Sequence, residues 1–74
     1  MKKLIAQGLQ YGFRLRNKTG VNEIIFTPAR RYGVQMYYRA ELSLHGWGLT
    51  RVVRITPGTA ERMADNKNFD FFVA

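Results

Sequence analysis

The feature of this sequence that most constrains its fold is an alternation of apolar and polar residues over positions 34–45. Side chains of a β-strand point to opposite faces in turn, so a period of two predicts a strand with one buried and one wetted face. One set of alternating positions is Val34, Met36, Tyr38, Ala40, Leu42 and Leu44, and the other is Gln35, Tyr37, Arg39, Glu41, Ser43 and His45. A strand of this kind is typical of an antiparallel sheet.

Shorter segments flank this strand with related patterns. We predict further strands at Leu9–Arg16, Val21–Thr27, Leu49–Thr56 and Phe69–Val73. Pro28 and Pro57 are expected to end the second and fourth of the five strands, because proline has no backbone N–H to donate. Thr59 is a suitable N-cap for a short helix, Ala60–Asn66, before the last strand. Residues 2–7 fit either a helical turn or an extension of the first strand.

Together these elements predict an α+β fold that is mostly β and spans residues 1–74 as a single small basic domain. Two architectures fit: an open antiparallel five-stranded sheet, or an SH3-like barrel with one short helix before the last strand. The chain has 74 residues and no cysteine. It would therefore depend on apolar burial without disulfides, and a chain of this length buries only about 60% of its unfolded surface.

The turns set the expected strand pairing of the first hairpin. The residues Asn-Lys-Thr-Gly at 17–20 have turn chemistry. With a tight turn there, Phe13 faces Ile24 and Arg14 faces Glu23. Opposite charges and apolar residues would then pair on separate faces.

The most informative of the predicted cross-strand residue pairs lies in the second hairpin. A turn at Gly46–Trp47 places Leu44 opposite Leu49. Arg39 then faces Arg54 directly across the ladder, where like charges are destabilising by some tenths of a kcal/mol. Such a pair favours an anionic partner over stability alone, although a solvated face is the simpler alternative.

The net charge of the chain supports binding to an anionic partner. The chain has 12 Lys and Arg against 5 Asp and Glu, a formal net charge of +7. Arginines that contact phosphates, beside aromatic rings that stack on bases, are typical of nucleic-acid binding. The candidate contacts are Arg39, Arg54, Arg30, Arg31 and Arg14 for phosphates, with Tyr37 and Trp47 for stacking. The expected function is that of a nucleic-acid-binding accessory protein.

A second class of function remains open. A small regulator or inhibitor, of the type that phages and other mobile elements encode, would dock on an acidic surface of a larger protein complex. Phe72 falls beside Asp70 on the face of the last strand that the core does not need. There it would suit a contact with another protein or the seam of a homodimer.

No set of residues predicts catalysis. The single histidine, His45, lies near the single serine, Ser43, but no third orienting residue or oxyanion-hole motif accompanies them. Glu61 and Asp65 share a helical spacing that is better explained by a solvated face. We therefore expect no enzymatic activity, no metal and no cofactor. No apolar run approaches the roughly 20 residues of a membrane span, so we expect a cytoplasmic protein.

Overall fold

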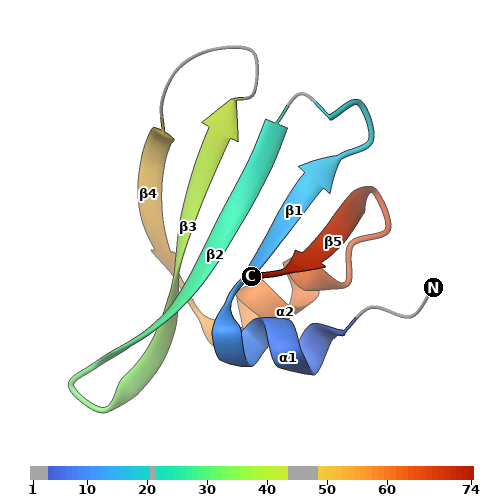
Figure 1. Cartoon of the computed structure of the whole chain (residues 1–74). Helices are drawn as coiled ribbons and strands as arrows, with labels where there is room; N and C mark the ends of the chain where they lie inside the picture. The colour runs from blue at the N-terminus through green and yellow to red at the C-terminus, as the bar shows by residue number, and fades with distance from the viewer. Residues whose placement is uncertain (1–3, 21, 44–48) are drawn as a thin grey trace.

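The computed structural model describes residues 4–20, 22–43 and 49–74. Within these ranges the elements in chain order are α1 (Ile5–Tyr11), β1 (Phe13–Asn17), β2 (Asn22–Arg31), β3 (Val34–Ser43), β4 (Leu49–Ile55), α2 (Pro57–Ala64) and β5 (Phe69–Val73). All paired strands are antiparallel and form one sheet in the order β4-β3-β2-β1-β5 (Figure 1). The predicted fold class is confirmed, and this order matches the open sheet of the two predicted architectures.

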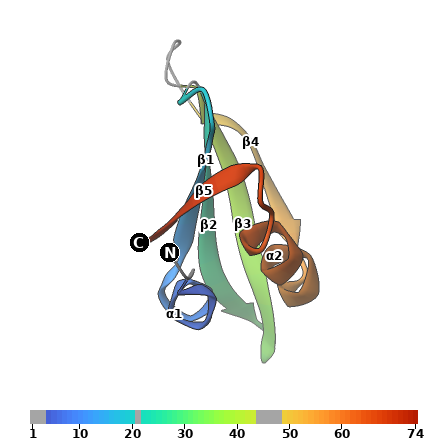
Figure 2. The ribbon, with the colours of Figure 1, turned by 90° about the vertical axis from the view of Figure 1, so that its right-hand side faces the viewer.

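Both helices lie at the same end of the molecule (Figures 1 and 2) and pack on one face of the sheet, here called the helix face. The chain passes from β4 at one edge of the sheet through α2 to β5 at the other edge. The core of the helix face consists of Phe13, Leu15, Ile24, Phe26, Tyr37, Ala60 and Ala64. Neither helix has the length and apolar character needed to cross a membrane.

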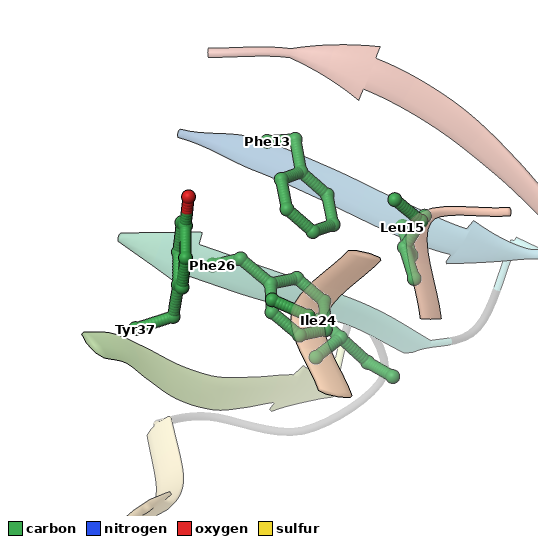
Figure 3. Packing of buried hydrophobic residues seen from close by; sticks show 7 residues of the cluster. Phe13, Leu15, Ile24, Phe26 and Tyr37 are labelled. Atoms are coloured by element: carbon green, nitrogen blue, oxygen red, sulfur yellow. The ribbon is translucent and has the colours of Figure 1, made fainter. Parts of the chain in front are cut away.

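A pair of phenylalanine rings forms the centre of this core (Figure 3). Phe13 of β1 lies directly opposite Phe26 of β2, and the rings stack with centroids 4.3 Å apart. Phe71 of β5 packs on the other side of Phe13 at 5.4 Å. All three residues come from neighbouring or next-neighbouring strands, so their packing joins one edge of the sheet to its centre.

The start of the chain differs from the prediction. Residues 9–11 belong to α1, and β1 begins only at Phe13. Gly12 separates them at φ 103°, a conformation that glycine adopts readily. Ile5 and Leu9, four residues apart, pack against the core as one helical stripe. The period-two interpretation was wrong here because Leu9 and Tyr11 also fit an alternation with Phe13.

The β1–β2 pairing is displaced by two residues from the predicted register. Arg16, rather than Arg14, lies opposite Glu23, and Leu15 lies opposite Ile24. A shift of two residues leaves each side chain on its expected face. It also brings the two large rings of the core together, which the predicted pairing of Phe13 with Ile24 would not.

Pro28 does not end β2, which continues to Arg31 and pairs with β3 along its whole length. The last residue of β2 paired with β1 is Phe26. Beyond it one side of β2 has no neighbouring strand, and proline is tolerated on such an edge. The strand thus runs up to the turn, which consists of Tyr32 and Gly33.

The helix α2 also begins earlier than predicted. Thr56, rather than Thr59, is the N-cap, and its hydroxyl accepts a hydrogen bond from the Thr59 N–H at 3.3 Å. Pro57 occupies the first turn, where its missing N–H has no intrahelical partner to lose. The proline that was expected only to end a strand also starts the helix.

Gly8 offers a test of how closely α1 packs. A Cβ added at Gly8 would lie 2.6 Å from Cζ of Phe71 and 3.0 Å from Cβ of Phe13. We expect Gly8→Ala to lower the free energy of unfolding by about 1–2 kcal/mol in urea denaturation. Gly58→Ala is the matched control, because nothing lies within 4 Å of its added Cβ. It should be neutral or stabilising by up to about 1 kcal/mol. Equal effects of the two substitutions would contradict this packing.

Candidate functional site

The register of β3 and β4 decides which arginines share a surface. Tyr38 lies opposite Arg54 and Arg39 lies opposite Val53, with a bulge between Ala40 and Leu42. This register differs by one residue from the predicted one, and a one-residue shift exchanges the two faces of a strand. The prediction that Arg39 faces Arg54 was therefore wrong. The two side chains belong to opposite faces of the sheet.

Arg39 and Tyr37 both belong to the helix face. The Arg39 Nη2 donates to Glu41 Oε1 at 2.7 Å, so a carboxylate already pairs with this guanidinium. Tyr37 is buried, and its hydroxyl donates to the backbone oxygen of Leu9 in α1. Burial raises the pKa of the Tyr37 hydroxyl. The predicted surface of Arg39, Tyr37 and Arg54 does not form, and Tyr37 presents no ring for base stacking.

The other face of the sheet, here called the outer face, is covered by neither α1 nor α2. Strand pairing and alternation assign to it Arg14, Arg16, Glu23, Ile25, Thr27, Ala29, Arg31, Val34, Met36, Tyr38, Ala40, Leu42, Val52, Arg54, Asp70 and Phe72. Val52 is 55% exposed and Phe72 36% exposed. The outer face therefore combines apolar residues with arginines in contact with water.

Arg14, Arg16, Glu23 and Phe72 form a cluster at the β1 end of the outer face. Arg14 Nη1 lies 3.2 Å from Glu23 Oε1, and Arg16 Nη2 lies 3.1 Å from Glu23 Oε2. Glu23 is only 4% exposed although no helix covers it. Both guanidinium groups also lie over the Phe72 ring, at 5.7 and 5.2 Å from its centroid. One carboxylate and one ring thus hold two arginine side chains in place.

This cluster retains a positive excess. Two guanidinium groups share one carboxylate, and their side chains are still 42% and 40% exposed. Asp70, the next carboxylate on this face, forms an ion pair with Lys18 at 2.8 Å. Free N–H donors of Arg14 and Arg16 are therefore available to a ligand, since a guanidinium has five.

Arg54 and Arg31 extend the positive charge along the outer face. Arg54 lies opposite Tyr38, and Arg31 lies opposite Val34, four residues before Tyr38 in β3. At about 3.4 Å per residue, the two positions are roughly 14 Å apart along the strand. Both arginines are exposed, and no carboxylate in residues 4–20, 22–43 or 49–74 forms an ion pair with either.

The end of the β2–β3 hairpin carries a second group of exposed residues. Arg30 and Arg31 precede the turn residue Tyr32, whose ring lies 5.5 Å from the Arg31 guanidinium carbon. Both arginines were predicted as contacts, and both are exposed in the structure. Trp47, the other predicted stacking residue, lies outside the described residues, as does the predicted turn at 46–47.

The sequence analysis missed two outer-face residues, Arg16 and Tyr38. Arg16 shares the period-two position of Arg14, a signal that the sequence already contains. Tyr38 was assigned to the core, but its neighbour Arg39 lies opposite the core residue Phe26, so Tyr38 belongs to the outer face. Phe72 lies on the face expected for it, beside Asp70, and is partly exposed.

The chain matches no protein-family model, no curated protein and no solved structure. Among the residues that the structure describes, no three His, Asp or Glu side chains gather in a way that could hold a metal ion. The function therefore has to be inferred from the residues on the surface of the protein.

Removal of the shared carboxylate tests the cluster. Glu23→Gln leaves two neighbouring guanidinium groups without a counter-charge, so we expect a loss of about 1–2 kcal/mol in unfolding free energy. The loss stays below that of a fully buried pair, because both arginines remain in partial contact with water. Asp70→Asn, which breaks an exposed pair with Lys18, is the matched control and should cost under about 0.5 kcal/mol. Urea denaturation measures both, and equal losses would contradict a structural role for Glu23.

Proposed function

We propose that this chain is a small nucleic-acid-binding accessory protein that contacts the phosphate backbone through the arginines of its outer face. One observation carries the proposal. The outer face presents Arg14, Arg16, Arg31 and Arg54, whereas its carboxylates are the buried Glu23 and the paired Asp70. An uncovered surface with this imbalance attracts a polyanion.

Arginine suits this role because its planar guanidinium can donate two parallel hydrogen bonds to one phosphate. Glu23 and Phe72 orient Arg14 and Arg16 before any ligand arrives. A side chain that is already ordered loses less conformational entropy on binding. Glu23 therefore balances part of the charge of the two arginines, and together with Phe72 it also holds them in an ordered conformation that favours phosphate binding.

The sheet also supplies width and aromatic surface. Four inter-strand steps separate β4 from β5, a width of about 19 Å at roughly 4.8 Å per step. Arg54 lies on one edge strand, and Arg14 and Arg16 lie next to the other. Tyr38 lies on the same face and offers a ring on which a base can stack. The Phe72 ring is already covered by the guanidinium groups of Arg14 and Arg16.

The same face supports one alternative, an acidic protein surface. The exposed apolar side chains Val52 and Phe72 favour it, since apolar anchors are typical of protein interfaces. The two candidates differ in salt dependence. Phosphates on a nucleic acid carry condensed counterions whose release makes the affinity fall steeply with salt.

Salt dependence therefore tests the proposal. If four phosphates are contacted, the logarithm of the affinity should fall with the logarithm of salt concentration at a slope of about −3 to −4. Fluorescence anisotropy with a labelled single strand and a labelled duplex measures it. Arg54→Gln should weaken binding and reduce the slope by about 0.7–0.9, because it removes one phosphate contact.

Arg62→Gln is the matched control. Arg62 is an exposed arginine of α2, away from the outer face, and its Nη2 donates to the Thr59 hydroxyl. It changes the net charge by the same amount as Arg54→Gln and should leave the slope unaltered. A slope near zero, or equal effects of the two substitutions, would remove the outer face as a nucleic-acid site and favour the acidic protein surface.

A further inference from the structure

The β2–β3 hairpin extends beyond the rest of the sheet (Figure 1). The pairing of β1 with β2 ends at Phe26, and the pairing of β4 with β3 ends at Tyr37. Residues 29–36 therefore form a two-stranded ribbon without lateral neighbours, joined by the turn at Tyr32 and Gly33. Three residues of each strand, at about 3.4 Å each, give it a reach of roughly 10 Å before the turn.

Tyr32 at the turn has an unusual conformation. Its φ is 52°, in the left-handed region, and Gly33 follows at φ 74°. Two positive values define a type I′ turn, in which asparagine and glycine are preferred at these positions. A left-handed residue with a Cβ costs about 1–2 kcal/mol.

Nothing in the packing of the described residues offsets this cost. Tyr32 is 92% exposed, and its one ring contact is the Arg31 guanidinium. A large aromatic ring is thus held at the tip of a ribbon, at a position where a small residue would be more stable. Strain at an exposed residue supports a role outside the fold.

The ribbon carries one arginine on each of its two faces. Arg30 and Arg31 are consecutive in β2, so their side chains lie on opposite faces of the ribbon. Both are exposed, and no carboxylate in the described part of the chain forms an ion pair with them. A ligand with negative charge on both sides of the hairpin would complement this arrangement.

We infer that the ribbon enters the major groove of double-stranded DNA, an inference that rests on the proposed nucleic-acid function. That groove is about 12 Å wide and admits a two-stranded β-ribbon. Its phosphate strands lie on either side, where Arg30 and Arg31 would meet them or reach base edges. Tyr32 at the tip would contact the edges of the bases. The major groove of duplex RNA is too deep and narrow for such contacts.

Three labelled probes test this inference: a duplex DNA of about 20 base pairs, a duplex RNA of the same sequence, and one DNA strand alone. We expect the unaltered protein to bind the DNA duplex more tightly than the RNA duplex. Tyr32→Asn should weaken binding to the DNA duplex about tenfold and change binding to the single strand less than twofold. Anisotropy titrations at one fixed salt concentration measure each affinity.

Tyr32→Asn is a favourable test because Asn-Gly suits a type I′ turn. Its unfolding midpoint in urea should equal or exceed that of the unaltered protein, so weaker binding would not reflect a lost fold. Arg31→Gln should also weaken duplex binding, while Arg62→Gln should not.

The outcomes separate the two levels of the proposal. If Arg54→Gln weakens binding but Tyr32→Asn leaves the DNA duplex affinity unchanged, the hairpin inference is overturned and the outer-face function stands. Equal affinity for duplex RNA and duplex DNA also overturns the hairpin inference. Failure of the unaltered protein to bind any of the three probes overturns both.

Discussion

The stacked rings of Phe13 and Phe26 determine which side of this sheet becomes the core. They lie directly opposite each other on β1 and β2, fully buried, and Gly8 of α1 packs close to Phe13. Because side chains alternate along a strand, the residues next to each ring must point the other way. The position of this one pair therefore fixes Arg14 and Ile25 on the outer face, and with them the face of every neighbour on these strands.

The buried carboxylate of Glu23 explains why arginines lie on the outer face. Glu23 is removed from water by the guanidinium groups that neutralise it, and an isolated buried charge would be strongly destabilising. A cation beside Glu23 is thus required for stability alone. Two arginines fill this role, which leaves an excess of one positive charge above the Phe72 ring. The proposed binding surface therefore includes a cluster that also stabilises the fold.

The sequence was sufficient to predict the five strands, the short helix before the last of them and the antiparallel class, since these depend on local periodicity. It was insufficient for the β3–β4 register. That register includes a bulge and a buried Tyr37 whose hydroxyl binds Leu9 of α1, 28 residues away. No local pattern reveals such a contact. Arg39 lies opposite Phe26 on the helix face, and the displaced β3–β4 register pairs Arg54 with Tyr38 instead. The predicted site therefore changed while the predicted fold did not.

A net charge of +7 does not by itself locate a binding surface. A cation that already forms an ion pair with a carboxylate attracts an anionic ligand less than an unpaired cation does. Arg39 has its own carboxylate, Lys18 has another, and Arg14 with Arg16 share a third. Only the exposed arginines without such partners offer a ligand a full charge. Among the described side chains of the sheet, Arg30, Arg31 and Arg54 meet that condition, and they lie on the strands that form or border the projecting hairpin. Arg62 of α2 also meets it, but that helix lies away from the outer face. The free arginine charge of the sheet is therefore concentrated toward this hairpin, the part of the sheet that contributes least to the core.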